Sequence, residues 1–184
     1  FDFAWNMIHG TPGEDGKLQG YLDMMGIPYN TSNHLSAALT FNKYTCKTFL
    51  KQHQVLTPEA RLVKKGVVAN LEEIAENVGI PCFVKPNNGG SSFGIAKVVK
   101  FENLKTAIEE ALKEDDEVII ERYIKGTEVT CGLMKTREGF TVFPITEEER
   151  VTRRILMEEN QDVILHVVDA KNLPRMLPFT LQLI

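Results

Sequence analysis

Residues 82–94 constrain the fold most strongly, because a short apolar run there leads directly into a loop rich in glycine and serine. The apolar run over 80–84 predicts a buried strand with Lys85 at its end, and Pro86 should then interrupt the pairing of that strand. A second β-type run follows at 95–99. The pattern predicts a β-hairpin whose tip is the glycine-rich loop.

The composition of this loop suits contact with phosphate. Gly89 and Gly90 have no Cβ, so their backbone N–H groups can approach an anion closely. Ser91 and Ser92 add hydroxyl donors, and Lys85 adds a compact positive charge. Taken alone, such a loop is also compatible with an ordinary surface turn beside a solvated lysine.

Two other phosphate-binding motifs are excluded. A P-loop requires Gly-Lys-Ser/Thr at the start of a helix, whereas Gly94 is followed here by Ile95. The dinucleotide-binding pattern Gly-x-Gly-x-x-Gly is also absent from the chain. The expected phosphate site is therefore a hairpin lid rather than a strand-to-helix turn.

Composition bounds the class of protein. A chain of 184 residues, 43% hydrophobic and 25% charged, can form one domain or two small ones. A net charge of −4 without a basic cluster argues against a nucleic-acid partner. Three widely spaced cysteines fit a reducing cytosol, and no apolar run is long enough to span a membrane. We therefore expect a cytoplasmic protein. Residues 1–8 are expected to be the later part of a β-strand from a longer chain.

Periodicity before the lid predicts helices and one extended segment. A helix is expected over 17–25, followed by a single helix from a cap at Ser32 or Asn33 to about residue 50, with Lys43 inside it. An extended segment should follow Pro58, and Asn70 with Glu73 resembles a capping box for the next helix.

Beyond the lid, the pattern predicts a helix over 104–112, a strand over 117–121 and a hairpin formed by 128–134 and 140–144. From residue 81 onward the elements suggest an antiparallel sheet with helices on one face. The predicted fold class is therefore α+β.

A set of short motifs follows in order along residues 9–128: His9-Gly…Gly-Glu-Asp-Gly16, Leu18-Gln-Gly20, Gly26-Ile-Pro-Tyr29, Asn42-Lys43, Val84-Lys-Pro86, Gly90-Ser-Ser-Phe-Gly94 and Glu121-Arg-Tyr-Ile…Gly-Thr-Glu128. Taken together, these motifs resemble the D-alanine–D-alanine ligase family of ATP-grasp enzymes over about residues 3–146. The resemblance implies that 1–56 form the end of an N-terminal substrate domain and 57–146 a lid and nucleotide-binding subdomain.

The resemblance also implies roles for individual residues. Lys43 and Lys85 would contact the phosphates of ATP, and Ser91 and Ser92 would lie in the lid near the phosphates and the first substrate. His9 and Glu14 would face that substrate, so His9, Glu14 and Ser91 are the candidate catalytic residues. The main chain of Glu121, Arg122, Tyr123 and Ile124 would read the adenine edge, and Glu128 would bind the ribose.

The activity implied by the family is ATP-dependent synthesis of the D-alanyl-D-alanine dipeptide, for peptidoglycan, through an acyl phosphate. ATP and Mg²⁺ would be the cofactors and D-alanine the substrate, and the family commonly forms homodimers. Phosphoryl transfer of this kind depends mostly on positioning and charge neutralisation, which paired lysines and a closing lid supply.

After Thr146 the resemblance ends, and the family's Mg²⁺ ligands are not identifiable in this chain. Residues 147–184 instead suggest a helix–strand–helix segment of different origin, similar to scaffold of the GTPase domain of ferrous iron transport protein B. We therefore expect an incomplete ATP-grasp protein with impaired activity. A non-catalytic ATP-binding module and a fragment of the iron transporter's GTPase domain remain as alternatives.

Overall fold

The computed structural model describes residues 2–89, 93–126, 129, 131–136 and 139–144. The chain divides into two compact units, of which the described parts are residues 2–123 and residues 124–144. The helix–strand–helix segment expected over 147–184 lies outside the described residues.

A four-stranded sheet forms the centre of the first unit, with the strand order β1-β4-β2-β3. Its strands are β1 (Ala60–Lys64), β4 (Glu117–Arg122), β2 (Cys82–Pro86) and β3 (Ala96–Val98), and every neighbouring pair is antiparallel. The expected β2–β3 hairpin around the glycine-rich loop is confirmed. The strand ends one residue later than predicted: Pro86 is the last residue of β2 and lies opposite Val118, and the β2–β4 pairing stops there.

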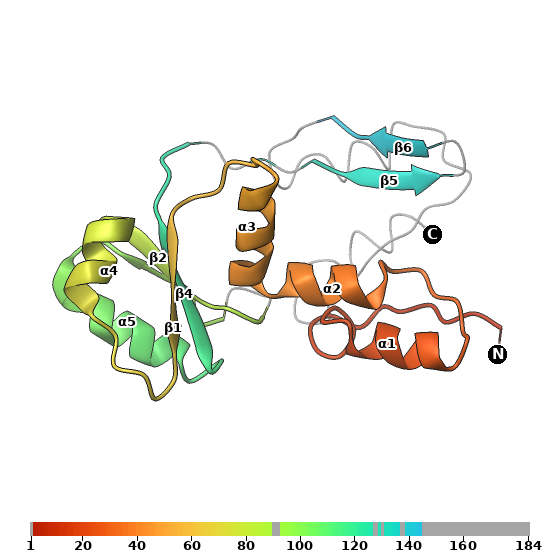
Figure 1. Cartoon of the computed structure of the whole chain (residues 1–184), viewed down its shortest axis with the longest axis horizontal. Helices are drawn as coiled ribbons and strands as arrows, with labels where there is room; N and C mark the ends of the chain where they lie inside the picture. The colour runs from red at the N-terminus through yellow and green to blue at the C-terminus, as the bar shows by residue number, and fades with distance from the viewer. Residues whose placement is uncertain (1, 90–92, 127–128, 130, 137–138, 145–184) are drawn as a thin grey trace, which may run out of the picture. The chain divides into compact units, whose positions relative to one another are not determined.

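Helices α4 (Leu71–Val78) and α5 (Leu104–Ala111) pack on one face of this sheet, as predicted (Figure 1). A short 3₁₀ turn, η1 (Phe101–Asn103), precedes α5. Asn70 caps α4 by accepting a hydrogen bond from the Glu73 backbone N–H, so the expected capping interaction forms. The buried core between helices and sheet includes Val63, Ile74, Val78, Cys82, Val84, Val98, Leu104, Ile108, Ala111, Val118 and Ile120.

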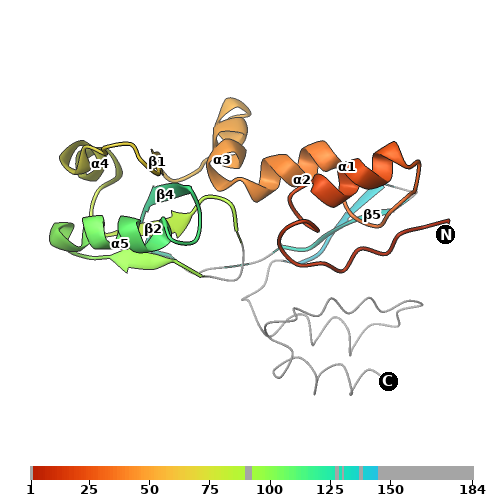
Figure 2. The ribbon, with the colours of Figure 1, turned by 90° about the horizontal axis from the view of Figure 1, so that it is seen from below.

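The opposite face of the sheet has a different character. Along β2, Cys82 and Val84 are buried in the core, whereas Phe83 and Lys85 are only partly buried. Because side chains alternate along a strand, Phe83 and Lys85 project from the face that α4 and α5 leave open. Helix α3 (Lys43–Gln52) lies on that side of the sheet, as Figures 1 and 2 show.

The single helix predicted over about 33–50 is wrong: the structure has two helices, α2 (His34–Phe41) and α3. They are separated at Asn42, whose extended backbone (φ −83°, ψ 103°) cannot continue a helix. Asn42 also caps α3, because its side chain accepts a hydrogen bond from the Thr45 N–H. Lys43 is consequently the first residue of α3 rather than an interior residue of a longer helix.

The N-terminal residues do not form the strand that the sequence suggested. Over the described residues 2–8, the ladder pairing is one isolated bridge between Ala4 and Tyr29. Helix α1 (Lys17–Met24) follows as predicted, and Gly26 ends it with a positive φ of 66°.

The second unit contains the hairpin of β5 (Leu133–Thr136) and β6 (Gly139–Val142), which pair antiparallel from Leu133↔Val142 to Thr136↔Gly139. This confirms the expected hairpin, although β5 continues two residues past the predicted end of the first strand at residue 134. Among the described residues, none of the helices is long and apolar enough to cross a lipid bilayer.

Candidate functional site

Three elements bring a carboxylate and two lysines together on the open face of the sheet. Glu121 on β4 contacts Lys85 on β2 through Oε2 and Lys47 on α3 through Oε1, each Nζ–O distance being 2.7 Å. The side chains of Lys47 and Glu121 are only 14% and 13% exposed, and that of Lys85 is 26% exposed. This is a mostly desolvated charge cluster and not a loose surface ion pair.

The two lysines determine the charge state of Glu121. Burial alone would raise the pKa of this carboxyl, but the hydrogen bonds from Lys47 and Lys85 outweigh it and leave the pKa below its ordinary value of 4.5. Glu121 is therefore ionised at neutral pH, with each oxygen bound to a different ammonium group.

Lys43 lies beside this cluster and is held by carbonyl groups. Its Nζ donates to the carbonyl oxygens of Pro86 (3.0 Å), Asn87 (3.4 Å) and Gly89 (2.7 Å). Burial and the positive charge of Lys85 together lower the pKa of Lys43 below its ordinary value of 10.5. An anion placed between Lys43 and Lys85 would relieve their repulsion.

A group of asparagines fixes the start of α3 against the base of the lid. The fully buried Asn87 accepts from the Tyr44 N–H at 2.9 Å and donates to Glu117 Oε2 at 2.8 Å. Its carbonyl accepts from the Lys43 N–H at 3.1 Å. The side-chain amide of Asn42 donates to Asn88 Oδ1 at 2.8 Å, and the same two residues form an isolated antiparallel backbone bridge. Side-chain and main-chain contacts therefore both join α3 to the segment after β2.

Aromatic rings continue the open face beyond Lys85. The ring of Phe83 lies 5.9 Å from that of Tyr123, and Lys85 Nζ lies 5.2 Å from the Phe83 centroid. Lys97 Nζ lies 3.7 Å over the Tyr123 ring, within the range of a cation–π contact. Flat apolar rings beside a cluster of lysines offer one surface for an aromatic group and another for an anion.

The predicted substrate residues His9 and Glu14 lie together in the loop before α1. Their Nδ1 and Oε2 atoms are 3.3 Å apart, and Glu14 Oε2 also accepts from the Gly10 N–H at 2.7 Å. Buried Gln19 stabilises this loop by donating to the Gly13 carbonyl at 2.7 Å and to Thr31 Oγ1 at 3.0 Å. The structure therefore places the His9–Glu14 pair in a loop that hydrogen bonds from Gln19 hold in place.

All four residues predicted to read the adenine edge, Glu121 to Ile124, are among the described residues. The backbone N–H groups of Arg122 and Tyr123 donate to the carbonyls of Glu59 and Pro81, so both amides are committed within the first unit. The Arg122 side chain donates to carbonyls of Asn77 and Val78 at the end of α4. Ile124 is exposed and belongs to the second unit. Gly90, Ser91, Ser92 and Glu128 lie outside the described residues.

Lys47 was not predicted. Its sequence position, one turn after Lys43 on a helix rich in lysine, gave no sign of a partner, because Glu121 is distant in the chain. The spacing of four residues from Lys43 was the available signal, since residues at i and i+4 share one face of a helix.

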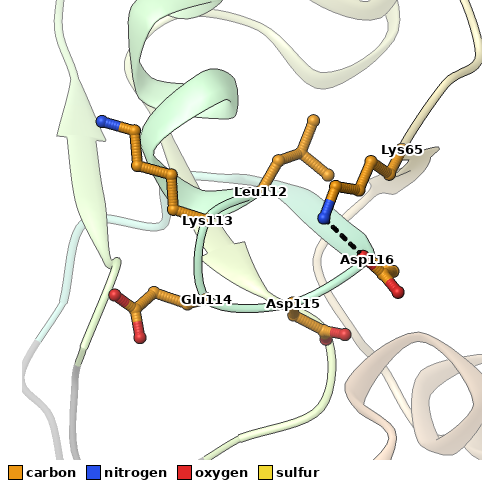
Figure 3. Close-up of a pocket in the computed structure, with 6 residues that line it drawn as sticks. All are labelled: Lys65, Leu112, Lys113, Glu114, Asp115 and Asp116. Atoms are coloured by element: carbon orange, nitrogen blue, oxygen red, sulfur yellow. Dashed lines mark hydrogen bonds and ion pairs between the residues drawn. The ribbon is translucent and has the colours of Figure 1, made fainter.

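A separate polar hollow of about 250 Å³ lies at the loop between α5 and β4 (Figure 3). Lys65 and Asp116 form an ion pair of 2.8 Å at its rim. Asp115, which also lines it, accepts from the Asn88 backbone N–H. The hollow is lined by Lys65, Leu112, Lys113, Glu114, Asp115 and Asp116.

Among the residues that the structure describes, no group of three or more His, Cys, Asp or Glu is placed to hold a metal ion.

An antiparallel sheet with two helices on one face, and lysines at the base of a glycine-rich hairpin on the other, is consistent with an α+β fold of the ATP-grasp type. The family model for the D-ala D-ala ligase C-terminus matches residues 49–171, and that for the D-ala D-ala ligase N-terminus matches residues 1–32. The chain belongs to the D-alanine–D-alanine ligase family. The first match crosses Thr146, where the sequence analysis placed the end of the resemblance.

Curated relatives named D-alanine–D-alanine ligase agree with this family assignment. The chain is 53% identical over 147 residues to the D-alanine–D-alanine ligase of Phocaeicola vulgatus, covering 80% of this chain and 45% of the relative. It is 49% identical over 148 residues to that of Porphyromonas gingivalis W83, again covering 80% of this chain and 45% of the relative. The chain thus spans about half the length of the curated relatives it matches.

Solved structures show the same fold. The VanG D-Ala:D-Ser ligase of Enterococcus faecalis superposes with a TM-score of 0.74 at 29% identity, covering 99% of this chain and 55% of that one. The D-alanine–D-alanine ligase of Bacillus anthracis complexed with ATP has a TM-score of 0.66 at 32% identity, covering 84% and 56%.

Proposed function

We propose that this chain supplies the phosphate-facing part of an ATP-dependent ligase that joins two D-alanine molecules for peptidoglycan synthesis. The observation that carries the proposal is the cluster of Lys43, Lys85 and Glu121 at the base of the lid hairpin, opposite the helix-covered face. Membership of the family and a structural relative in complex with ATP support it.

The proposed reaction proceeds in two steps. An oxygen of the first D-alanine carboxylate attacks the γ-phosphorus of ATP, and the bond to the β–γ bridging oxygen breaks to release ADP. The amine of the second D-alanine then attacks the acyl carbon, the tetrahedral intermediate expels phosphate, and the amine loses a proton. Both steps move negative charge among phosphate oxygens, so fixed cations beside them lower the barrier.

Lys85 and Lys43 are the residues proposed to meet the phosphates. Lys85 is oriented by Glu121, which uses one of its three N–H donors. Lys43 donates to three carbonyl oxygens, so it would release one of them to bond directly to a phosphate. Ser91 and Ser92 would complete the lid, and Glu128 would bind the ribose. His9 and Glu14, paired in the loop before α1, would face the first D-alanine.

Mg²⁺ would supply positive charge beside the phosphates in such a reaction. Among the described residues, no group of three or more His, Cys, Asp or Glu is placed to hold it, and the positive charge proposed for this chain is that of Lys43 and Lys85.

The test is a calorimetric titration of the chain with ATP and with GTP in the presence of Mg²⁺, on the wild type, Lys85→Met and Lys65→Met. Lys65 is the matched control, because it also pairs with one carboxylate but is 62% exposed and lies at the α5–β4 hollow. We expect saturable ATP binding that Lys85→Met weakens about tenfold or more and Lys65→Met leaves unchanged. Binding of GTP in preference to ATP, or of neither, would overturn the proposal.

A further inference from the structure

The carboxylate of Glu121 is shared between two lysines that come from different elements. Oε2 contacts Lys85, which the proposed function uses, and Oε1 contacts Lys47, which it does not. Lys47 is the less exposed of the two, at 14% against 26%. A lysine that is buried to this extent beside an already paired carboxylate requires an explanation beyond solubility.

We propose that Lys47 is a positioning residue that holds Glu121 and balances part of its charge, so that the carboxylate offsets less of the electrostatic field of Lys85 at a polyphosphate. The inference rests on the proposed function, and it assigns to α3 a second lysine that acts on the nucleotide site without touching the nucleotide.

Charge counting shows what Lys47 changes. With Lys43, Lys47 and Lys85 each +1 and Glu121 −1, the four groups sum to +2. Without Lys47 the sum is +1, and Glu121 then has Lys85 as its one remaining partner within this set. A closed Lys85–Glu121 pair attracts an anion less strongly, because the carboxylate cancels most of the field of the ammonium group. Repulsion between Glu121 and the phosphates would also increase.

The geometry of α3 makes this role possible. Lys43 and Lys47 are four residues apart, so they lie on the same face of the helix. The start of α3 is anchored by Asn87, which bonds to the backbone N–H groups of both Lys43 and Tyr44. The helix therefore presents Lys43 to the lid loop and Lys47 to Glu121 from one fixed position.

The next lysine on the same helix provides a matched control. Lys51 Nζ lies 3.1 Å from Glu59 Oε1, but the two side chains are 69% and 45% exposed. An ion pair so open to solvent is screened and contributes little. Lys51→Met therefore removes the same charge from the same helix without disturbing Glu121.

The experiment measures binding of Mg²⁺–ATP, of tripolyphosphate and of adenosine to the wild type, Lys47→Met, Lys47→Arg and Lys51→Met, at two salt concentrations. We expect Lys47→Met to weaken ATP and tripolyphosphate about tenfold and to flatten the salt dependence. Adenosine binding should not change. Lys47→Arg, which keeps the charge, should recover most of the affinity, and Lys51→Met should match the wild type.

Two failures are distinguishable. If the wild type binds ATP and Lys47→Met binds it equally well, or if Lys51→Met loses as much, the role of Lys47 is overturned while the proposed function stands. If the wild type binds neither ATP nor tripolyphosphate, the proposed function fails and this inference fails with it. Circular dichroism checks that each variant is folded. Should Lys47→Met unfold, the affinity of Lys47→Arg becomes the test. A folded Lys47→Arg that binds ATP and tripolyphosphate much more weakly than the wild type would contradict the charge-balancing role of Lys47.

Discussion

The side-chain oxygen of Asn87 accepts a hydrogen bond from the backbone N–H of Tyr44 at 2.9 Å, across 43 residues of sequence. Asn87 directly follows β2, and Tyr44 is in the first turn of α3, so this contact joins the lid strand to the helix that carries Lys43 and Lys47. Asn87 is fully buried and also bonds to Glu117. This side chain therefore helps to place the lysines on α3, together with the Lys43 N–H bond to the Asn87 carbonyl and the Asn42–Asn88 contact.

Replacing Asn87 by Ala should destabilise the first unit by about 3 kcal/mol, because it leaves partly buried polar groups of Tyr44 and Glu117 without their bonds and removes a fully buried side chain. Urea unfolding measures the change. Asn103→Ala is the control, because Asn103 is exposed and its side chain makes no capping hydrogen bond to α5, and it should change stability by less than about 0.5 kcal/mol. Equal effects of the two substitutions would contradict the role given to Asn87.

Gly94, at the end of the lid loop, should not tolerate alanine. Its φ is +67°, and a Cβ there would come within 2.9 Å of Pro86 Cγ and 3.0 Å of Glu114 Cγ. Gly66 has a similar φ of +79° but open space around it. We expect Gly66→Ala to cost about 1 kcal/mol from the backbone alone, and Gly94→Ala to cost about 2–4 kcal/mol because overpacking adds to that strain. Thermal unfolding measures the loss of stability in each variant. Equal losses in Gly94→Ala and Gly66→Ala would contradict the steric contribution assigned to Pro86 and Glu114.

The Glu121 cluster should make stability depend on acid pH. The pKa of Glu121 in the fold lies below its ordinary value of 4.5, since the hydrogen bonds from Lys47 and Lys85 outweigh the opposing effect of burial. The stabilisation is therefore fully present above pH 4.5 and is lost as the pH falls through the lowered pKa.

The measurement is the difference in free energy of unfolding between the wild type and Glu121→Gln as a function of pH. We expect the wild type to be more stable by about 2 kcal/mol at pH 7, with the difference shrinking below pH 4.5. Glu110→Gln, which removes an exposed carboxylate paired with Lys113, should cost less than about 1 kcal/mol at pH 7. A Glu121 difference that stays constant to the lowest pH measured would contradict the charge state assigned here.

The strand and helix pattern of the sheet could be predicted because local signals agreed with tertiary structure. Apolar runs predicted β2 and β4, and the Asn70–Glu73 spacing predicted the start of α4. The break between α2 and α3 could not be predicted from periodicity, because the apolar spacing continues across it. It lies at Asn42, which caps α3 through the Thr45 N–H and also forms a long-range bridge with Asn88.

Sequence reasoning singled out those residues of the candidate site that belong to family motifs and missed those whose contacts depend on a partner distant in sequence. Lys43, Lys85 and Glu121 belong to the motifs, and the structure brings them together. Lys47 and Asn87 have no local signature, since their partners lie 74 and 43 residues away in the chain. The expected strand over 1–8 failed for a related reason: composition alone does not supply a neighbouring strand.

The central claim is that ATP binds on the open face of the sheet, and chemical-shift mapping of the ¹⁵N-labelled chain with Mg²⁺–ATP tests it most directly. The account predicts that the largest changes occur at Lys43, Lys47, Phe83, Lys85 and Glu121, and that they are reduced in Lys85→Met. Changes centred instead on Lys65 and residues 112–116, around the polar hollow between α5 and β4, would contradict it.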